Sequence, residues 1–129
     1  MPLEETSIEK HREKILIVDD DETILHILKG FFIRKGFQVS VAKDGWVAME
    51  KLRVENPAIV LTDLKMPSCS GIDLIQFIRQ NTKETPVVVM TGYPYLYPEK
   101  WNRDNVRAYF VKPFDTDEMF SSIQRILGG

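Results

Sequence analysis

The chain has 129 residues, of which 43% are apolar and 28% are charged, and its formal net charge at pH 7 is −2. This length and balance indicate one globular domain and exclude a disordered chain and a collagen-like repeat. Because the basic residues form no stripe, we expect no direct binding to nucleic acid. The single cysteine, Cys69, excludes an internal disulfide. The sequence has neither a signal peptide nor an apolar run of membrane length, which predicts a cytoplasmic location without membrane contact.

The first 13 residues differ in composition from the rest of the chain. They are mostly polar or charged, and Leu3 and Ile8 are their large aliphatic side chains. We therefore predict a polar extension over residues 1–13 and one domain over residues 14–129.

Short apolar runs alternate with segments of helical period from Lys14 onward, which is the pattern of a parallel β-sheet with helices on both faces. The run FQVSVA alternates apolar and polar residues and predicts an edge strand, whereas ILIV, IVL and VVVM are continuous and fit interior strands. The five predicted strands cover residues 15–18, 37–42, 59–62, 87–90 and 108–111.

Four helices are predicted between and after these strands. The first stops at Gly36, a good helix terminator. Asp44 can cap the second, which ends before Pro57, and Ser70 with Asp73 resembles a capping box that opens the third. Asp115 and Glu118 can begin the last helix. Apolar residues recur at helical spacing in all four: Ile24, Ile27, Leu28 and Phe31 in the first; Ala48, Met49 and Leu52 in the second; Leu74, Ile75 and Ile78 in the third; and Met119, Ile123, Ile126 and Leu127 in the last.

The segment between the fourth and fifth strands, YPYLYPEKWNRDN, is irregular. Pro94 and Pro98 would each interrupt a regular helix, so a helix there must be short. The three tyrosines and Trp101 of this segment are either packing side chains or an exposed surface for a partner.

Carboxylate, hydroxyl and ammonium side chains, which can bind a metal or a phosphoryl group, follow four of the predicted strands. In a sheet of this kind every strand points its carboxyl end to the same edge, so the residues just after the strands are neighbours. The residues that the strands deliver there are Asp19, Asp20 and Asp21 after the first, Asp63 after the third, Thr91 after the fourth and Lys112 after the fifth.

Several carboxylates within a few ångströms cannot all stay ionised unless a cation joins them, and an all-oxygen site suits Mg²⁺. With the metal present, one carboxylate can attack a phosphoryl donor while a lysine and a hydroxyl contact the transferred group. The implied chemistry is formation of an aspartyl phosphate. Any one of the three consecutive aspartates taken alone would more often be a helix N-cap than a metal ligand, so the set as a whole carries the prediction.

The motifs KILIVDDDE, PAIVLTDLKMPSCSGIDLI, PVVVMTG and AYFVKPF together resemble the response-regulator receiver domain of two-component signalling, over residues 14–127. The resemblance implies a flavodoxin-like (βα)5 fold with strand order 2-1-3-4-5. It also implies Mg²⁺ as the cofactor and Asp63 as the phosphoacceptor. Asp20 would be the direct metal ligand, Asp19 a second acid acting largely through water, and Asp21 the residue that begins the first helix.

The same resemblance assigns further roles around the predicted pocket. The backbone carbonyl of Lys65 would complete the metal shell, and Thr91 and Lys112 would contact the phosphoryl group. Tyr109 matches the aromatic residue that changes rotamer on activation, so Thr91 and Tyr109 would form the switch. The peptide between Lys112 and Pro113 is usually cis in these proteins.

Two positions depart from the usual pattern of the family. Gly92 follows Thr91 where a small side chain is common, and it still leaves room for a phosphoryl group. The proline-containing segment replaces the expected regular helix. Lys65 and Tyr93 lie where the family tunes hydrolysis of the acyl phosphate, and a bulky Tyr93 would slow it by shielding the group from water.

Two other functions also fit parts of the sequence. The stretch Asp19-Asp20-Asp21-Glu22-Thr23 matches the DxDxT motif of haloacid-dehalogenase-type phosphohydrolases, in which Asp19 would be the nucleophile. The helical period that begins directly after these acids leaves no room for the flap of such enzymes, and Asp63 would have no role. The third possibility is a binding module that keeps the fold without phosphorylation. His11, His26 and Cys69 are interpreted as bystanders.

The predicted function is a phosphorylation switch, not an enzyme acting on an external metabolite. A sensor histidine kinase or a phosphotransfer protein would donate the phosphoryl group, and an effector domain or a downstream protein would receive the signal. A phosphorylation-dependent homodimer is possible in such proteins. A stand-alone regulator and the amino-terminal part of a longer effector protein fit the sequence equally well.

Overall fold

The computed structural model describes residues 13–66, 69–82, 84–92 and 105–128 of the chain. The predicted extension over residues 1–13, except Glu13, and the irregular segment over residues 93–104 lie outside the described residues. The short helix expected between the fourth and fifth strands therefore stays a prediction.

Five parallel strands form one sheet in the order β2-β1-β3-β4-β5. This confirms the flavodoxin-like α/β fold and its predicted strand order. The predicted edge strand β2 lies at one margin, and the continuous apolar runs form the three interior strands β1, β3 and β4. The strands are β1 (Lys14–Val18), β2 (Gln38–Ala42), β3 (Ile59–Asp63), β4 (Val87–Thr91) and β5 (Val106–Val111), each within two residues of its predicted limits.

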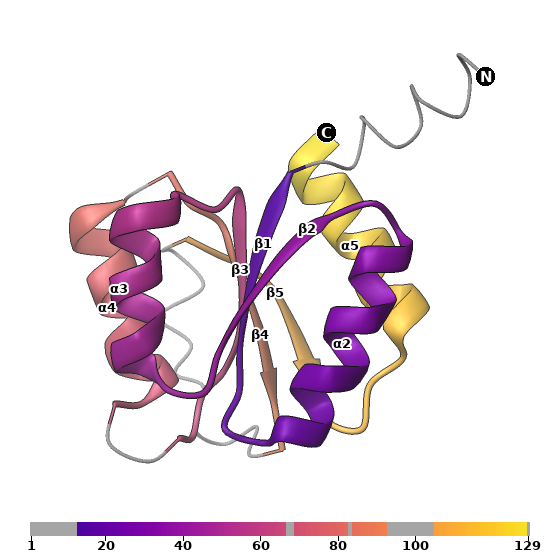
Figure 1. Cartoon of the computed structure of the whole chain (residues 1–129), viewed down its shortest axis with the longest axis horizontal. Coiled ribbons are helices and arrows are strands. Elements are labelled where there is room, and N and C mark those ends of the chain that lie inside the picture. Colours follow the sequence, from indigo (N-terminus) through magenta and orange to yellow (C-terminus); the bar gives the residue numbers. More distant parts are fainter. Residues whose placement is uncertain (1–12, 67–68, 83, 93–104, 129) are drawn as a thin grey trace.

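Helices cover both faces of the sheet (Figure 1). On one face lie α2 (Glu22–Arg34) and α5 (Thr116–Gly128), and on the other lie α3 (Gly45–Glu55) and α4 (Gly71–Asn81). Each layer has its own apolar core, because alternate strand residues point to opposite faces. No helix among the described residues is both long and apolar enough to cross a lipid bilayer.

The predicted caps begin the helices. The Asp44 side chain accepts from the N–H of Val47 at the start of α3, and Ser70 and Asp73 form a reciprocal capping box at α4. The Asp115 side chain accepts from the N–H groups of residues 117 and 118 at the start of α5. These caps fix where each helix begins relative to the carboxyl edge of the sheet.

The buried face of α2 differs from the set of apolar residues at the predicted spacing. Leu25, Leu28 and Phe32 are buried, whereas Ile27 is 55% exposed. The segment carries more apolar residues than one helix face can bury, so two overlapping stripes satisfy the same period. Packing against β2 and β1 selects one stripe and leaves Ile27 at the surface.

Candidate functional site

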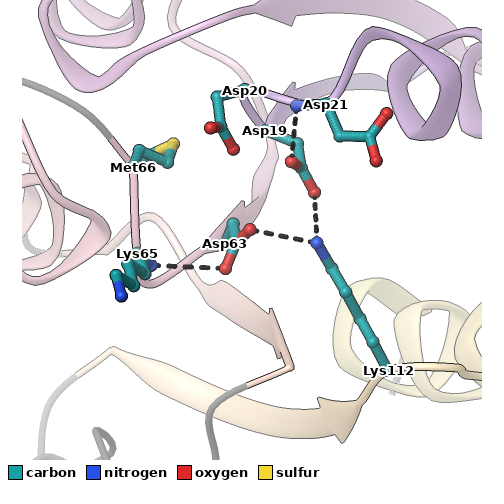
Figure 2. Close-up of a pocket in the computed structure, with 7 residues that line it drawn as sticks. All are labelled: Asp19, Asp20, Asp21, Asp63, Lys65, Met66 and Lys112. Atoms are coloured by element: carbon teal, nitrogen blue, oxygen red, sulfur yellow. Dashed lines mark hydrogen bonds and ion pairs between the residues drawn. The ribbon is translucent and has the colours of Figure 1, made fainter.

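The carboxyl edge of the sheet holds a polar pocket of about 500 Å³. Figure 2 shows the pocket with side chains from the loops that follow β1, β3 and β5. These loops are neighbours because β1 pairs with β3, and β3 with β4, which pairs in turn with β5. The residues that line the pocket are Asp19, Asp20, Asp21, Asp63, Lys65, Met66 and Lys112.

Three of the acids lie close enough together to share one metal ion. Asp19, Asp20 and Asp63 each offer a carboxylate oxygen, and these oxygens lie within 4.8 Å of one another. Asp19 and Asp63 are buried, and Asp20 is exposed at the mouth of the pocket. An all-oxygen donor set that is open to water on one side suits Mg²⁺, which keeps several water ligands. The residues present therefore fit the predicted cofactor.

Lys112 lies between the two buried acids. Its Nζ is 2.8 Å from Asp19 Oδ2 and 3.0 Å from Asp63 Oδ2. Figure 2 shows the lysine side chain reaching from the β5 loop to a point between both carboxylates. The Lys112–Pro113 peptide bond is cis, as the sequence resemblance implied. One ammonium group thus partly compensates two negative charges that are removed from water.

The backbone orients the carboxylate of Asp63. Oδ1 accepts hydrogen bonds from the N–H of Leu64 at 2.6 Å and from the N–H of Lys65 at 3.3 Å, while Oδ2 faces Lys112. The Lys65 side chain is exposed and points away from the three acids in Figure 2. Lys65 therefore contributes its backbone N–H to the pocket, and the role of its carbonyl as a metal ligand stays a prediction.

Asp19 and Asp21 have different structural roles at the end of β1. The Asp21 side chain caps α2 by accepting from the N–H groups of Thr23 and Ile24, and it points away from the pocket (Figure 2). The N–H of Asp21 in turn donates to Asp19 Oδ1 at 2.9 Å. Three consecutive aspartates are tolerated because one is a cap, one is exposed and one is buried beside a lysine.

Burial changes the titration of two groups in the pocket. Desolvation raises the pKa of Asp19 above its usual range, although the hydrogen bond from Lys112 opposes this shift. Burial alone would lower the pKa of Lys112, but its hydrogen bonds to Asp19 and Asp63 prevail and raise it. In the absence of a metal, burial therefore disfavours the charge on Asp19, while the two carboxylates favour the charged form of Lys112.

We expect Asp19→Asn to raise the free energy of unfolding by about 1 kcal/mol in metal-free buffer at pH 7. The raised pKa means that ionised Asp19 is less stable in the folded chain than in the unfolded chain, so removing its charge favours folding. The amide keeps the size of the side chain and an oxygen that can accept from Asp21. Urea denaturation in EDTA measures the change, with the exposed Asp117→Asn as control. A variant less stable than wild type would contradict this account.

Comparisons with known proteins agree on one family. The sequence profile of the response regulator receiver domain matches residues 15–124. The chain belongs to the response regulator receiver domain family. It is 33% identical over 116 residues to sporulation initiation phosphotransferase F of Bacillus subtilis, covering 89% of this chain and 94% of that protein. It is 34% identical over 115 residues to the regulatory protein AtoC of Escherichia coli, covering 88% of this chain but only 25% of that protein.

Solved structures support the same assignment. The receiver fold of this chain superposes on the response regulator TrrA of Thermotoga maritima, crystallised with Mg²⁺ and BeF, with a TM-score of 0.82 and 28% identity. That match covers 89% of this chain and 99% of TrrA. TrrA in complex with the histidine kinase ThkA matches with a TM-score of 0.80. The phosphohydrolase alternative is set aside, because α2 begins at Glu22, directly after the three aspartates.

The predicted switch residues of the receiver domain lie on β4 and β5. Thr91 ends β4 and is buried, and its carbonyl accepts from the N–H of Lys112 at 2.8 Å. Tyr109 lies in β5, half-buried against the core under α3 and α4, and burial raises the pKa of its hydroxyl. A Cβ built on Gly92 would meet no atom within 4 Å among the described residues. The predicted room for a phosphoryl group beside Thr91 stays a prediction, since residues 93–104 lie outside the described residues.

Two residues that support the site, Thr62 and Gly71, were not identified as functional from the sequence. Thr62 is fully buried, and its hydroxyl donates to the carbonyl oxygen of Asp63 at 2.8 Å. Gly71 packs so closely that an added Cβ would stand 1.9 Å from that same oxygen. Cys69 is buried and burial raises its thiol pKa, consistent with a bystander, and His26 is exposed on α2. His11 lies outside the described residues.

Proposed function

We propose that this receiver domain is a phosphorylation switch in which Asp63 accepts a phosphoryl group from a phosphohistidine of a histidine kinase or phosphotransfer protein. The observation that carries the proposal is the arrangement around Asp63. Its carboxylate is oriented by two backbone N–H groups, faces a lysine, and lies beside two further acids that can hold a metal with it. Such a set serves no evident structural need and is costly to bury.

Asp19, Asp20, Asp63 and the backbone carbonyl of Lys65 would hold Mg²⁺. When bound, the ion supplies positive charge that lets a negatively charged phosphoryl group approach a negatively charged carboxylate. Asp20 is the exposed member of the set and is suited to direct ligation, whereas buried Asp19, already hydrogen-bonded by Lys112 and Asp21, suits an outer position.

Transfer needs one bond made and one bond broken. A carboxylate oxygen of Asp63 attacks the phosphorus while the bond from phosphorus to the donor imidazole nitrogen breaks. Lys112 then contacts a phosphoryl oxygen in place of the carboxylate oxygen that it contacts here at 3.0 Å. The backbone N–H groups of Leu64 and Lys65 hold the acceptor in position. The domain would catalyse only its own phosphorylation and dephosphorylation.

The charge of the phosphoryl group would change the positions of side chains on the neighbouring strands β4 and β5. The Thr91 hydroxyl moves to bond a phosphoryl oxygen, and the space that it leaves allows Tyr109 to turn inward from its half-buried position on β5. The surface near β5 then changes its affinity for a partner. The residues 93–104, which would form much of that surface, lie outside the described residues.

The test is intact-mass spectrometry after incubation with Mg²⁺ and acetyl phosphate. We expect an adduct of one phosphoryl group that is removed by hydroxylamine, requires Mg²⁺ and is lost in Asp63→Asn. An adduct that survives in Asp63→Asn but vanishes in Asp19→Asn would contradict the proposal. No adduct in any variant would favour a binding module without phosphorylation.

The surface that receives the donor lies beside the pocket, on α2. A second, apolar cavity of about 450 Å³ shares Lys112 with the polar pocket. The exposed Ile27 helps to line it. Because a phosphohistidine must reach Asp63 through the mouth of the polar pocket, the protein that carries it must cover adjoining surface. The apolar cavity is lined by Ile24, Ile27, Leu28, Lys112, Pro113, Phe114 and Thr116.

We expect Ile27→Glu to slow phosphoryl transfer from a histidine kinase by at least about 10-fold. Phosphorylation by acetyl phosphate should stay within about two-fold of wild type, since the small donor needs no apolar surface. The matched control is Val54→Glu, which places the same charge at a 74% exposed apolar position on α3, across the sheet. Equal effects of both substitutions on transfer from the kinase would refute this docking surface.

The wider setting of the domain stays a proposal. The chain spans 25% of AtoC and 48% of the regulatory protein PhoP of Bacillus subtilis, but 94% of sporulation initiation phosphotransferase F. Both an attached effector domain and a separate downstream partner are therefore compatible with these relatives. The homodimer, the cytoplasmic location, the shielding role of Tyr93 and the domain boundary at residue 14 remain predictions.

A further inference from the structure

Thr62 is the residue before the predicted phosphoacceptor on β3. None of its surface is exposed, and the other residues of the strand before it, Ile59 to Leu61, are apolar. A hydroxyl at such a position must find an acceptor, because an unpaired buried polar group is costly. Its acceptor is the carbonyl oxygen of Asp63, 2.8 Å away.

The same peptide group that Thr62 holds also orients the acceptor side chain. The carbonyl of Asp63 and the N–H of Leu64 belong to one planar unit. That N–H donates to Asp63 Oδ1 at 2.6 Å. Because the plane is rigid, a hydrogen bond that fixes the carbonyl also fixes the direction of the N–H, and with it the carboxylate.

Helix α4 supports this peptide group from the other side. A Cβ on Gly71 would stand 1.9 Å from the carbonyl oxygen of Asp63, so only glycine allows the helix to approach this closely. The N–H of Gly71 also donates to the carbonyl of Leu64 at 2.8 Å. The peptide that follows Asp63 is thus held by a strand side chain and by the first turn of a helix.

We propose that Thr62 is a positioning residue for phosphoryl transfer: its hydroxyl fixes the Asp63–Leu64 peptide plane and thereby aims the Asp63 carboxylate. The inference rests on the proposed role of Asp63 as the acceptor. Thr62 acts on Asp63 through this backbone hydrogen bond. It is itself neither a proposed contact of the phosphoryl group nor a proposed metal ligand. Because Asp63 is also a proposed metal ligand, the rate of transfer is compared at saturating Mg²⁺, where weaker metal binding does not lower it.

The test compares Thr62→Val, which removes the hydroxyl but keeps the shape and the β-branch, with Thr62→Ser, which keeps the hydroxyl. We expect Thr62→Val to lower the maximal rate of phosphorylation by acetyl phosphate by about 10-fold, the size typical of a small misalignment. Thr62→Ser should stay within about three-fold of wild type. Thr85→Val, at a buried threonine at the opposite end of the sheet, should leave the rate unchanged.

Two further readouts separate positioning from a structural role. The lower rate of Thr62→Val should persist at saturating Mg²⁺, a concentration set from the Mg²⁺ dissociation constant that calorimetry gives for each variant, and the free energy of unfolding should not fall. A wild-type rate in Thr62→Val, or an equal loss in Thr62→Ser, would overturn the inference. A rate loss that is fully matched by lost stability, or that disappears at saturating Mg²⁺, would also overturn it.

The proposed function is tested separately by Asp63→Asn in the same assay. If that variant is still phosphorylated, Asp63 is not the acceptor and the proposed function fails. If it is not phosphorylated and Thr62→Val reacts as fast as wild type, the positioning role alone fails.

Discussion

Replacing Lys112 with methionine is expected to slow phosphorylation of Asp63 by about 100-fold. Lys112 Nζ lies 2.8 Å from Asp19 and 3.0 Å from Asp63, so its ammonium group directly contacts the proposed acceptor. Methionine keeps the length of the side chain and its apolar stem, which also lines the neighbouring cavity. The loss would therefore report the missing charge, measured as the initial rate of adduct formation with acetyl phosphate.

The matched control for this prediction is Lys65→Met. Lys65 also lines the pocket, but its side chain is exposed and points away from the three acids. We expect its initial rate to stay within about three-fold of wild type, because an exposed charge that points away from the acceptor is screened and contributes little. Equal losses in both variants would show that the general positive potential matters and that contact with Lys112 does not.

Replacing Gly71 with alanine is expected to lower the free energy of unfolding by about 3 kcal/mol. The added Cβ would stand 1.9 Å from the carbonyl oxygen and 2.8 Å from the carbonyl carbon of Asp63. Both are backbone atoms and cannot rotate away, so either β3 or the first turn of α4 must shift. The shift would also misplace the carboxylate of Asp63, so we expect slower phosphorylation together with the lower stability.

The control for Gly71 is Gly30→Ala, in the interior of α2. A Cβ there would meet only Nη1 of the flexible Arg34 side chain, at 3.3 Å. Because alanine favours helix over glycine, this variant should be more stable than wild type by about 0.5–1 kcal/mol. Urea denaturation of both variants measures the contrast. A Gly71→Ala protein that also gained stability would contradict the close approach of α4 to Asp63.

The fold was accessible from the sequence because its signals are local and repeated. Continuous apolar runs separated β1, β3 and β4 from the alternating edge strand β2, and caps such as Asp44 and Ser70 located the starts of helices. The face that α2 buries was less accessible. Its apolar residues fit two overlapping stripes, and contacts with β2 and β1 decide that Leu25 and Phe32 are buried while Ile27 is exposed.

The site was predictable to the level of residue types at strand ends. The convergence of Asp19, Asp63 and Lys112 follows from parallel strands whose carboxyl ends share one edge. The contacts of Thr62 and Gly71 that fix the peptide after Asp63 could not be predicted from the sequence. They depend on a hydroxyl bonding the next carbonyl and on the lack of a Cβ at Gly71, and neither leaves a periodic or spaced pattern in the sequence.

Borohydride trapping shows directly whether Asp63 carries the phosphoryl group. Hydride reduces an acyl phosphate to the alcohol and releases phosphate, so a phosphorylated aspartate becomes homoserine. Tandem mass spectrometry of peptides from the trapped protein should then find homoserine at position 63 and nowhere else. Homoserine at position 19, or aspartate retained at 63 in protein that carries the adduct, would contradict the account.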